Sequence, residues 1–360
     1  MPKKKTSIKD RGLVVGKDIG CTNIIRYHND ISPSLRQKKV FSGTTLGFVT
    51  PWNNHGYDIA KELNAKFTYI SPVWLQLQPT PGMPFLRGTH DIDQGWIEEV
   101  RSVKKGTPPL IVPRILFEGW SQEAYATMGT NSKLFDSIVT LIVTECQNHG
   151  FDGFVLDFSY LQFSGLDGIV NRLVKAIGNG LHNNNKKLIL VIPPFVPQYS
   201  LFSAEDYQTL YDSVDLFMMM TYDYSSGRKS AEGGPSAPIS WMTQSVLNLI
   251  PPSQRANVNH RDHKILLGLN FYGTTYCSEG SSNILGKDFI ELLETYHPTV
   301  KWNSEYSEHY INYNHEDIDW VAYYPTLKYI DDRLELAKSL DVGIGIWELG
   351  QGLDYFFDLF

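Results

Sequence analysis

The part of the chain best equipped for chemistry is residues 151–160, which read Phe-Asp-Gly-Phe-Val-Leu-Asp-Phe-Ser-Tyr. A short apolar run after a glycine is typical of a buried strand. Side chains alternate along a strand, so Val155, Asp157 and Ser159 share one face, and the opposite face is wholly apolar. A carboxylate and a hydroxyl on an inward face indicate that this face lines a site.

The segments around this strand predict a repeated strand–helix fold. Dense apolar runs predict buried parallel strands at 45–50, 67–73, 109–116, 153–158, 187–193, 214–222, 264–272 and 342–347. Helical periodicity is found at 57–64, 93–104, 133–148, 165–181, 204–212, 240–249, 286–295 and 327–340. This alternation predicts an α/β fold, a (β/α)8 TIM barrel with right-handed crossovers.

Two segments do not fit the barrel repeat. Residues 1–43 are polar and irregular, so we expect an N-terminal arm, followed by the barrel at 44–360. The interval between the seventh and eighth strands is too long for one helix, and its surplus contains aromatic, β-favouring pieces. We therefore expect a small α+β insertion at 274–325, forming one wall over the barrel mouth.

Aromatic and acidic residues follow the predicted strands, where barrel enzymes place their sites. We call this end, the C-terminal ends of the strands, the barrel mouth. Aromatic faces stack on sugar rings and leave the ring edges free for hydrogen bonds. The pattern predicts a saccharide-binding mouth that includes Trp52, Trp74, Trp120, Asp157, Tyr160, Tyr222, Asp223, Tyr272, Trp347 and Glu348.

The stretch at 151–160 resembles the signature strand of glycoside hydrolase family 18, Asp-Gly-x-Asp-x-Asp-x-Glu. Asp152, Gly153 and Asp157 match it, whereas Val155 replaces the first inner Asp and Ser159 replaces the catalytic Glu. Two further motifs are similar to the family's. The run 220–223, Met-Thr-Tyr-Asp, resembles Met-x-Tyr-Asp, whose Tyr positions the substrate's N-acetyl carbonyl, and Trp347 resembles the Trp beneath the central sugar.

Longer runs resemble the chitinase domain-containing protein family, also called stabilin-interacting chitinase-like proteins. They lie at 9–15, 49–53, 71–77, 220–225, 266–273 and 346–355. This resemblance implies a secreted or lysosomal protein that binds chito-oligosaccharides, has an innate immune role, and lacks the catalytic Glu. It also implies a stabilin-type scavenger receptor as a possible partner. Members carry a signal peptide, and the sequence as given shows no apolar leader.

The missing acid leads us to expect a lectin-like protein rather than an enzyme. The family's hydrolysis uses the substrate's own acetamido group together with the Glu as acid, and a serine hydroxyl does not supply a proton at useful pH. Asp157 is interpreted either as an acceptor for a sugar or as a structural carboxylate. Without a nearby cation, burial would raise its pKa. A divergent glycosidase using Asp157 or Asp223, and a protein-partner module with a vestigial cleft, remain alternatives.

Charge and hydropathy argue against two classes of partner, nucleic acids and the membrane interior. The net charge of −7 argues against a nucleic-acid surface, and no apolar run is long enough to span a membrane. Cys21, Cys146 and Cys277 show no metal-binding spacing, and His260 and His263 lie in a polar loop. We therefore expect no metal and no cofactor.

Overall fold

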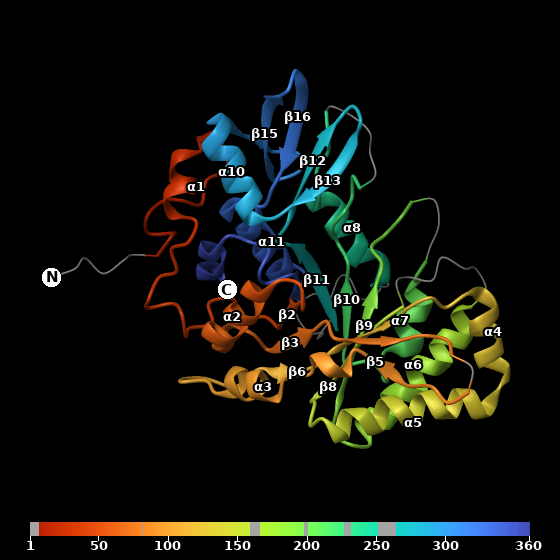
Figure 1. Ribbon diagram of the computed structural model, residues 1–360. Coiled ribbons are helices and arrows are strands. Elements are labelled where there is room, and N and C mark those ends of the chain that lie inside the picture. The colour runs from red at the N-terminus through yellow and green to blue at the C-terminus, as the bar shows by residue number, and fades with distance from the viewer. Residues whose placement is uncertain (1–6, 81, 159–165, 198–200, 227–231, 251–263) are drawn as a thin grey trace.

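The structure, a computed structural model, describes residues 7–80, 82–158, 166–197, 201–226, 232–250 and 264–360. Two parts are visible in Figure 1: a barrel of parallel strands surrounded by helices, and an antiparallel sheet above it. Among the described residues, no helix is long and apolar enough to cross a bilayer.

All eight predicted barrel strands are present. They are β2 (Thr45–Val49), β3 (Tyr69–Pro72) continued by β4 (Leu75–Leu77), β6 (Leu110–Ile111) continued by β7 (Arg114–Phe117), β8 (Gly153–Asp157), β9 (Lys187–Ile192), β10 (Leu216–Met219), β11 (Ile265–Asn270) and β17 (Gly343–Trp347). Neighbours pair in parallel, and a short hairpin strand, β5 (Leu86–Arg87), runs antiparallel to β4. The barrel closes because β3 pairs with β6, while β7, on the same segment, pairs with β8. The predicted TIM barrel is thus confirmed.

The two faces of the sheet bury separate clusters of side chains. The interior cluster includes Phe48, Val155, Val191 and Met218, and Trp347 packs against it. The outer faces of the strands carry a second set of apolar side chains, such as Phe154, which pack under the helices. The alternation predicted for β8 is therefore observed, with Val155 inside the barrel.

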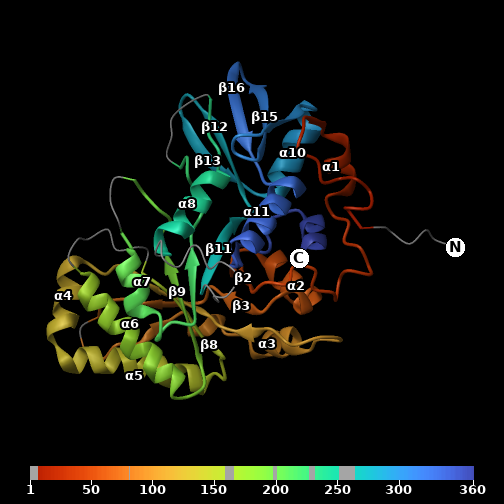
Figure 2. The same ribbon diagram turned by 180° about the vertical axis from the view of Figure 1, so that it is seen from behind.

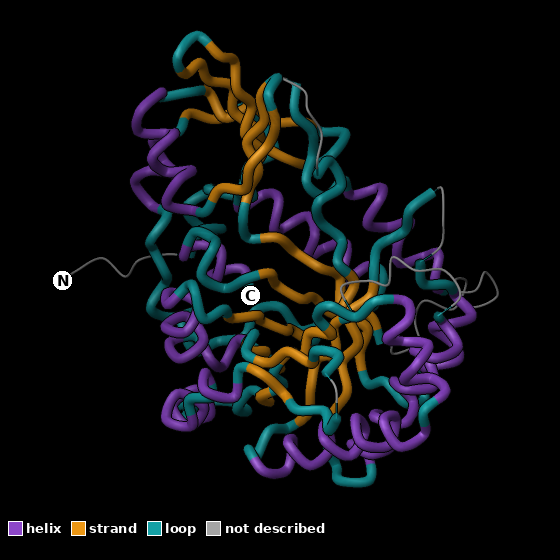
Figure 3. Tube along the Cα trace, turned by 45° about the vertical axis from the view of Figure 1, so that its right-hand side comes forward, coloured by secondary structure: helices purple, strands orange, loops and turns teal. Residues whose placement is uncertain are grey.

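Helices surround the strands, as Figure 3 shows. They are α2 (Asn54–Glu62), α3 (Gln94–Arg101), α4 (Gln122–Thr130), α5 (Ser132–Asn148), α6 (Asp167–His182), α7 (Ala204–Leu210), α8 (Ile239–Leu249) and α11 (Leu327–Ser339). Local sequence fixes several starts. Asn131 caps α5 by accepting from the Leu134 amide at 3.1 Å, and Ser203 forms a capping box with Asp206 in α7.

The insertion between β11 and β17 is the antiparallel sheet with one helix. It contains β12 (Gly273–Cys277), β13 (Gly280–Ile284), α10 (Gly286–Tyr296), β14 (Thr299–Asn303), β15 (Glu308–His315) and β16 (Ile318–Tyr323). The N-terminal arm supplies a further edge strand, β1 (Ile19–Gly20), which pairs with β14. The helix of the arm, α1 (Thr22–Tyr27), contacts α10 (Figure 2). The arm is therefore attached to the insertion.

Candidate functional site

A cavity of about 270 Å³ opens at the barrel mouth, and we call it the central pocket. Side chains from several strands and from the insertion reach it, so its shape depends on the whole fold. Its lining residues are Phe48, Arg114, Asp157, Val191, Met218, Met220, Tyr222, Asp223, Tyr272, Asn283, Leu285, Trp347 and Gln351. Five of the ten predicted saccharide-binding residues are brought together here: Asp157, Tyr222, Asp223, Tyr272 and Trp347.

Asp157 forms an ion pair in this pocket. The Arg114 guanidinium donates to its carboxylate at 3.1 Å, and the two side chains are only 13% and 10% exposed. Arg114 also lies over the Trp347 ring, 5.4 Å from its centroid. Asp157 therefore has a neighbouring cation inside the barrel. The inner floor of the pocket carries a fixed positive group.

Asp223 and two tyrosines form a second polar group. Asp223 has a left-handed backbone (φ 63°) and accepts a hydrogen bond from the Tyr272 hydroxyl at 2.5 Å. Burial raises the pKa of Asp223, and the Tyr272 hydrogen bond opposes that rise. Burial also raises the pKa values of Tyr222 and Tyr272 well above their ordinary range. Both phenols consequently remain protonated at neutral pH, with hydroxyl groups able to donate.

Among the remaining signature residues that the structure describes, Asp152 and Val155 do not form an acid–base pair. Val155 is buried inside the barrel. Asp152 lies at the start of β8, where it accepts from Arg101 at 2.7 Å and from the Ile111 amide at 2.8 Å. Its role there is structural, joining β8 to α3 and β6. Ser159 and Tyr160 lie outside the described residues.

Trp74 lies in the core instead of the mouth. It is fully buried, it donates to the Tyr57 hydroxyl at 2.7 Å, and its ring packs edge-on against Trp96. The strand continues beyond it as β4, and its neighbour Val73 faces the barrel interior, so strand alternation turns Trp74 toward the helices. No face of this indole is open to a sugar.

Trp120 and Glu348 are also outside the central pocket. Trp120 is 8% exposed, donates to the Leu77 carbonyl at 2.8 Å, and lines a separate groove of about 410 Å³. Glu348, which follows the end of β17, is completely buried. Its carboxylate accepts from Asn53 at 2.5 Å and from the Gly350 amide at 3.1 Å, and burial raises its pKa to about 7.

Trp52 is the most exposed of the predicted aromatics in the described chain. It is 69% exposed and lines a neighbouring depression of about 690 Å³. Leu285 of the insertion lines both this depression and the central pocket, so the two adjoin. Leu285 therefore lies between the central pocket and the depression at Trp52.

Sequence reasoning missed several lining residues. Arg114 could have been identified from the sequence, because a single charged residue within an apolar strand is unusual, as it is for Asp157. Asn283, Leu285 and Gln351 had none, because they reach the pocket from an insertion strand and loops whose positions depend on tertiary packing. Among the described residues, no group of His, Cys, Asp and Glu is arranged to hold a metal ion.

A parallel eight-stranded barrel with an aromatic and acidic pocket at its mouth defines a carbohydrate-active α/β barrel. Comparison with known families specifies which one: residues 44–352 match the Glycosyl hydrolases family 18 profile, and the chain belongs to this family.

Individual relatives are distant. The chain is 19% identical to the cortical fragment-lytic enzyme of Bacillus cereus over 265 residues, which are 71% of this chain and 59% of that enzyme. A chitinase from Chromobacterium violaceum superposes with a TM-score of 0.71 at 18% identity, covering 88% of this chain and 98% of the chitinase. The B. cereus spore cortex-lytic enzyme SleL superposes with a TM-score of 0.73 at 14% identity, covering 95% of this chain and 83% of that enzyme. The structural likenesses establish the fold.

Proposed function

We propose that this chain is a non-catalytic, lectin-like member of family 18 that binds chito-oligosaccharides or related N-acetylated saccharides at the barrel mouth. Relatives are named as chitinases and cortex-lytic enzymes, which supports a glycan as the ligand. The finer assignment to the chitinase domain-containing proteins, with a secreted or lysosomal setting and an innate immune role, belongs to the same proposal.

The observation that carries this proposal is the Arg114–Asp157 ion pair beside Val155. Hydrolysis in this family builds positive charge on the sugar ring, and a carboxylate must stabilise it. Here the one carboxylate left on the inner face of β8 is neutralised by a guanidinium at 3.1 Å, and Val155 offers no second one. The fixed Arg114 guanidinium repels the positive charge that would develop on the sugar ring. In addition, the chain has Ser159 at the position of the family's proton donor.

The same residues suit binding. The partly exposed face of Trp347 offers a stacking surface for a sugar ring. The Tyr222 hydroxyl remains protonated and can donate to an acetamido carbonyl, while Asp223 supplies an acceptor for hydroxyl or amide hydrogens. Further sugar units would extend toward Trp52.

Calorimetric titration with chitotetraose tests the proposal, with cellotetraose as the ligand that lacks acetamido groups. We expect saturable binding of chitotetraose and a loss of at least about tenfold in affinity for Trp347→Ala, because the stacking surface is removed. Trp320→Ala is the matched control, since Trp320 lies on β16 and stacks on Tyr313 of the insertion. Absence of chitotetraose binding to the unmutated protein would refute the proposal.

A divergent glycosidase is the second candidate, and the raised pKa of Asp223 favours it. A carboxyl group whose pKa is raised by burial holds its proton more tightly, which is the direction that an acid catalyst requires. Incubation of chito-oligosaccharides with the protein, analysed by mass spectrometry, decides between the two. Cleavage that disappears in Asp223→Asn or Asp157→Asn would establish the enzyme, whereas binding without cleavage supports the lectin.

A further inference from the structure

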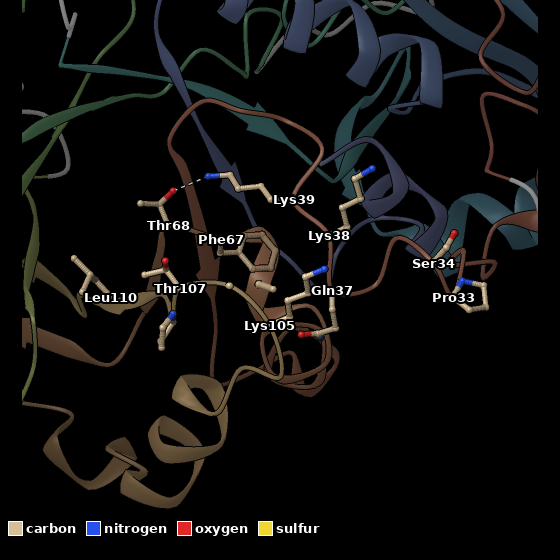
Figure 4. A pocket seen from close by; sticks show the side chains of 13 residues that line it. Pro33, Ser34, Gln37, Lys38, Lys39, Phe67, Thr68, Lys105, Thr107 and Leu110 are labelled. Atoms are coloured by element: carbon tan, nitrogen blue, oxygen red, sulfur yellow. Dashed lines mark hydrogen bonds between the residues drawn. The ribbon is translucent and has the colours of Figure 1, made fainter.

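A second cavity, of about 840 Å³, lies at the opposite end of the barrel from the central pocket. Its walls come from the N-terminal arm at 33–39, from 65–68 just before β3, and from 105–108 just before β6 (Figure 4). These segments precede the strands, so the cavity faces away from the barrel mouth. It lies outside the sites discussed so far.

The charged side chains that line this cavity are all lysines: Lys38, Lys39 and Lys105. No carboxylate is among the lining residues, and none of the three lysines forms an ion pair within the described part of the chain. By contrast, the nearby Arg36 is neutralised by Glu62 at 2.7 Å. In a chain of net charge −7, three uncompensated cations around one cavity make a local positive site. We call it the basic pocket.

Lys39 is the best-placed of these cations. Its ammonium group donates to the Thr68 hydroxyl at 2.9 Å, the bond drawn in Figure 4. Burial lowers its pKa to about 8, which reflects an ammonium that is partly withdrawn from water without a counter-ion. Behind the pocket, the fully buried Lys66 donates to the backbone carbonyls of Lys38 and Phe360. The nearby carboxylate of Asp358 accepts from Ser32.

The rest of the lining combines small polar and apolar groups. Ser34, Gln37, Thr68 and Thr107 provide hydrogen-bonding groups. Apolar surface comes from Pro33, Ala65, Pro108 and Leu110, whereas the Phe67 ring behind them is buried in the core. A free inorganic anion would use only the first set. A ligand with both an anionic group and an apolar body would use both.

We propose that the basic pocket binds an organic ligand that carries a phosphate or sulfate ester on an apolar, ring-sized body. The ester oxygens lie between Lys39 and Lys105, which act as point-charge partners, and Lys38, whose side chain points away from Lys39 (Figure 4), adds to the local positive charge. The ring lies against Pro108 and Leu110. This site is independent of the glycan pocket, and both ligands can bind at once.

Calorimetric titration of the full chain with para-nitrophenyl phosphate and para-nitrophenyl sulfate tests the site. Both probes have an anionic ester on a flat apolar ring, and para-nitrobenzyl alcohol serves as the uncharged analogue. We expect saturable binding of at least one ester and none of the alcohol. Binding of only one ester identifies the anion that the lysines select, and binding of both shows that the basic pocket accepts either.

Substitutions locate the binding. Lys39→Gln and Lys105→Gln should each weaken the ester by about tenfold or more, with unchanged circular dichroism and thermal midpoint. Lys133→Gln, an exposed lysine on α5, is the charge-matched control and should bind like the unmutated protein. Trp347→Ala should also leave ester binding unchanged, so failure of the glycan proposal does not affect this one. Absence of saturable ester binding, or an equal loss in Lys133→Gln, would overturn the inference.

Discussion

The residue after Trp347, Glu348, carries a carboxyl group that has no access to water. Glu348 is fully buried, and burial raises its pKa from 4.5 to about 7 despite hydrogen bonds from Asn53 and Gly350. An acid whose pKa is raised by folding binds its proton more tightly in the folded state. The contribution of Glu348 to the free energy of unfolding therefore falls as the pH rises from about 4.5 to about 7, and is constant above that.

Glu348→Gln should remove this pH dependence. The shift corresponds to about 3 kcal/mol between the two limits, because each pKa unit is worth about 1.4 kcal/mol. Urea denaturation of both proteins across this range measures the difference, and the slope should be smaller in the variant. Glu335→Gln is the control, since Glu335 is 58% exposed and pairs with Lys338. Parallel profiles for Glu348→Gln and the unmutated protein would contradict the assignment.

At the residue scale, strand alternation predicted which side chains of β8 face inward, and it identified Asp157 as lining the site. It could not identify the partner of Asp157. Arg114 is forty-three positions away along the chain and meets Asp157 only because β7 and β8 are neighbours in register. Trp74 was wrongly placed at the mouth because the predicted strand ended at residue 73, whereas the observed strand continues as β4.

At the scale of elements, a buried arginine joins α11 to the insertion. Arg333 is fully buried and donates to the carbonyls of Ser307 and Tyr329 at 3.0 Å each. Its guanidinium lies 3.5 Å from Glu308, whose carboxylate accepts from the amides of Ser236 and Ala237 ahead of α8. This ion pair therefore connects α11, β15 of the insertion and the segment that precedes α8.

Arg333→Met should destabilise the protein by about 3–5 kcal/mol, because it leaves the Glu308 carboxylate buried without its cation. Guanidinium denaturation measures the change. Lys338→Met, on the exposed side of the same helix, removes a surface pair with Glu335 and should cost about 0–1 kcal/mol. A comparable, small cost for both variants would show that the buried pair does not hold these elements together.

The barrel strands were predictable because a parallel sheet covered on both faces requires dense apolar runs. The insertion was predictable from the excess length between β11 and β17. The attachment of the arm was not, since β1 has only two residues, Ile19 and Gly20, and pairs with a strand almost three hundred positions away. Such a short edge strand carries no periodic signal of its own.

At the scale of the whole molecule, the arm also secures the C-terminus. The Tyr355 amide donates to the His28 carbonyl, and the Val40 amide donates to the Phe360 carbonyl, each at 2.9 Å. Asp358 accepts from the Ser32 amide at 2.9 Å and from its hydroxyl at 2.5 Å, and both residues are buried. Arm, insertion and C-terminus are thus linked around the barrel, which predicts one cooperative unfolding transition.

Ser32→Ala tests this coupling. It removes the hydroxyl partner of a buried carboxylate and should cost about 1–3 kcal/mol. If arm and barrel unfold together, tryptophan fluorescence and far-ultraviolet circular dichroism will shift to the same lower urea midpoint. Ser304→Ala, an exposed serine in the insertion, should leave the midpoint unchanged. Separate midpoints for the two signals in Ser32→Ala would instead mean that the arm detaches before the barrel unfolds, because only the local link between arm and C-terminus would then have been weakened.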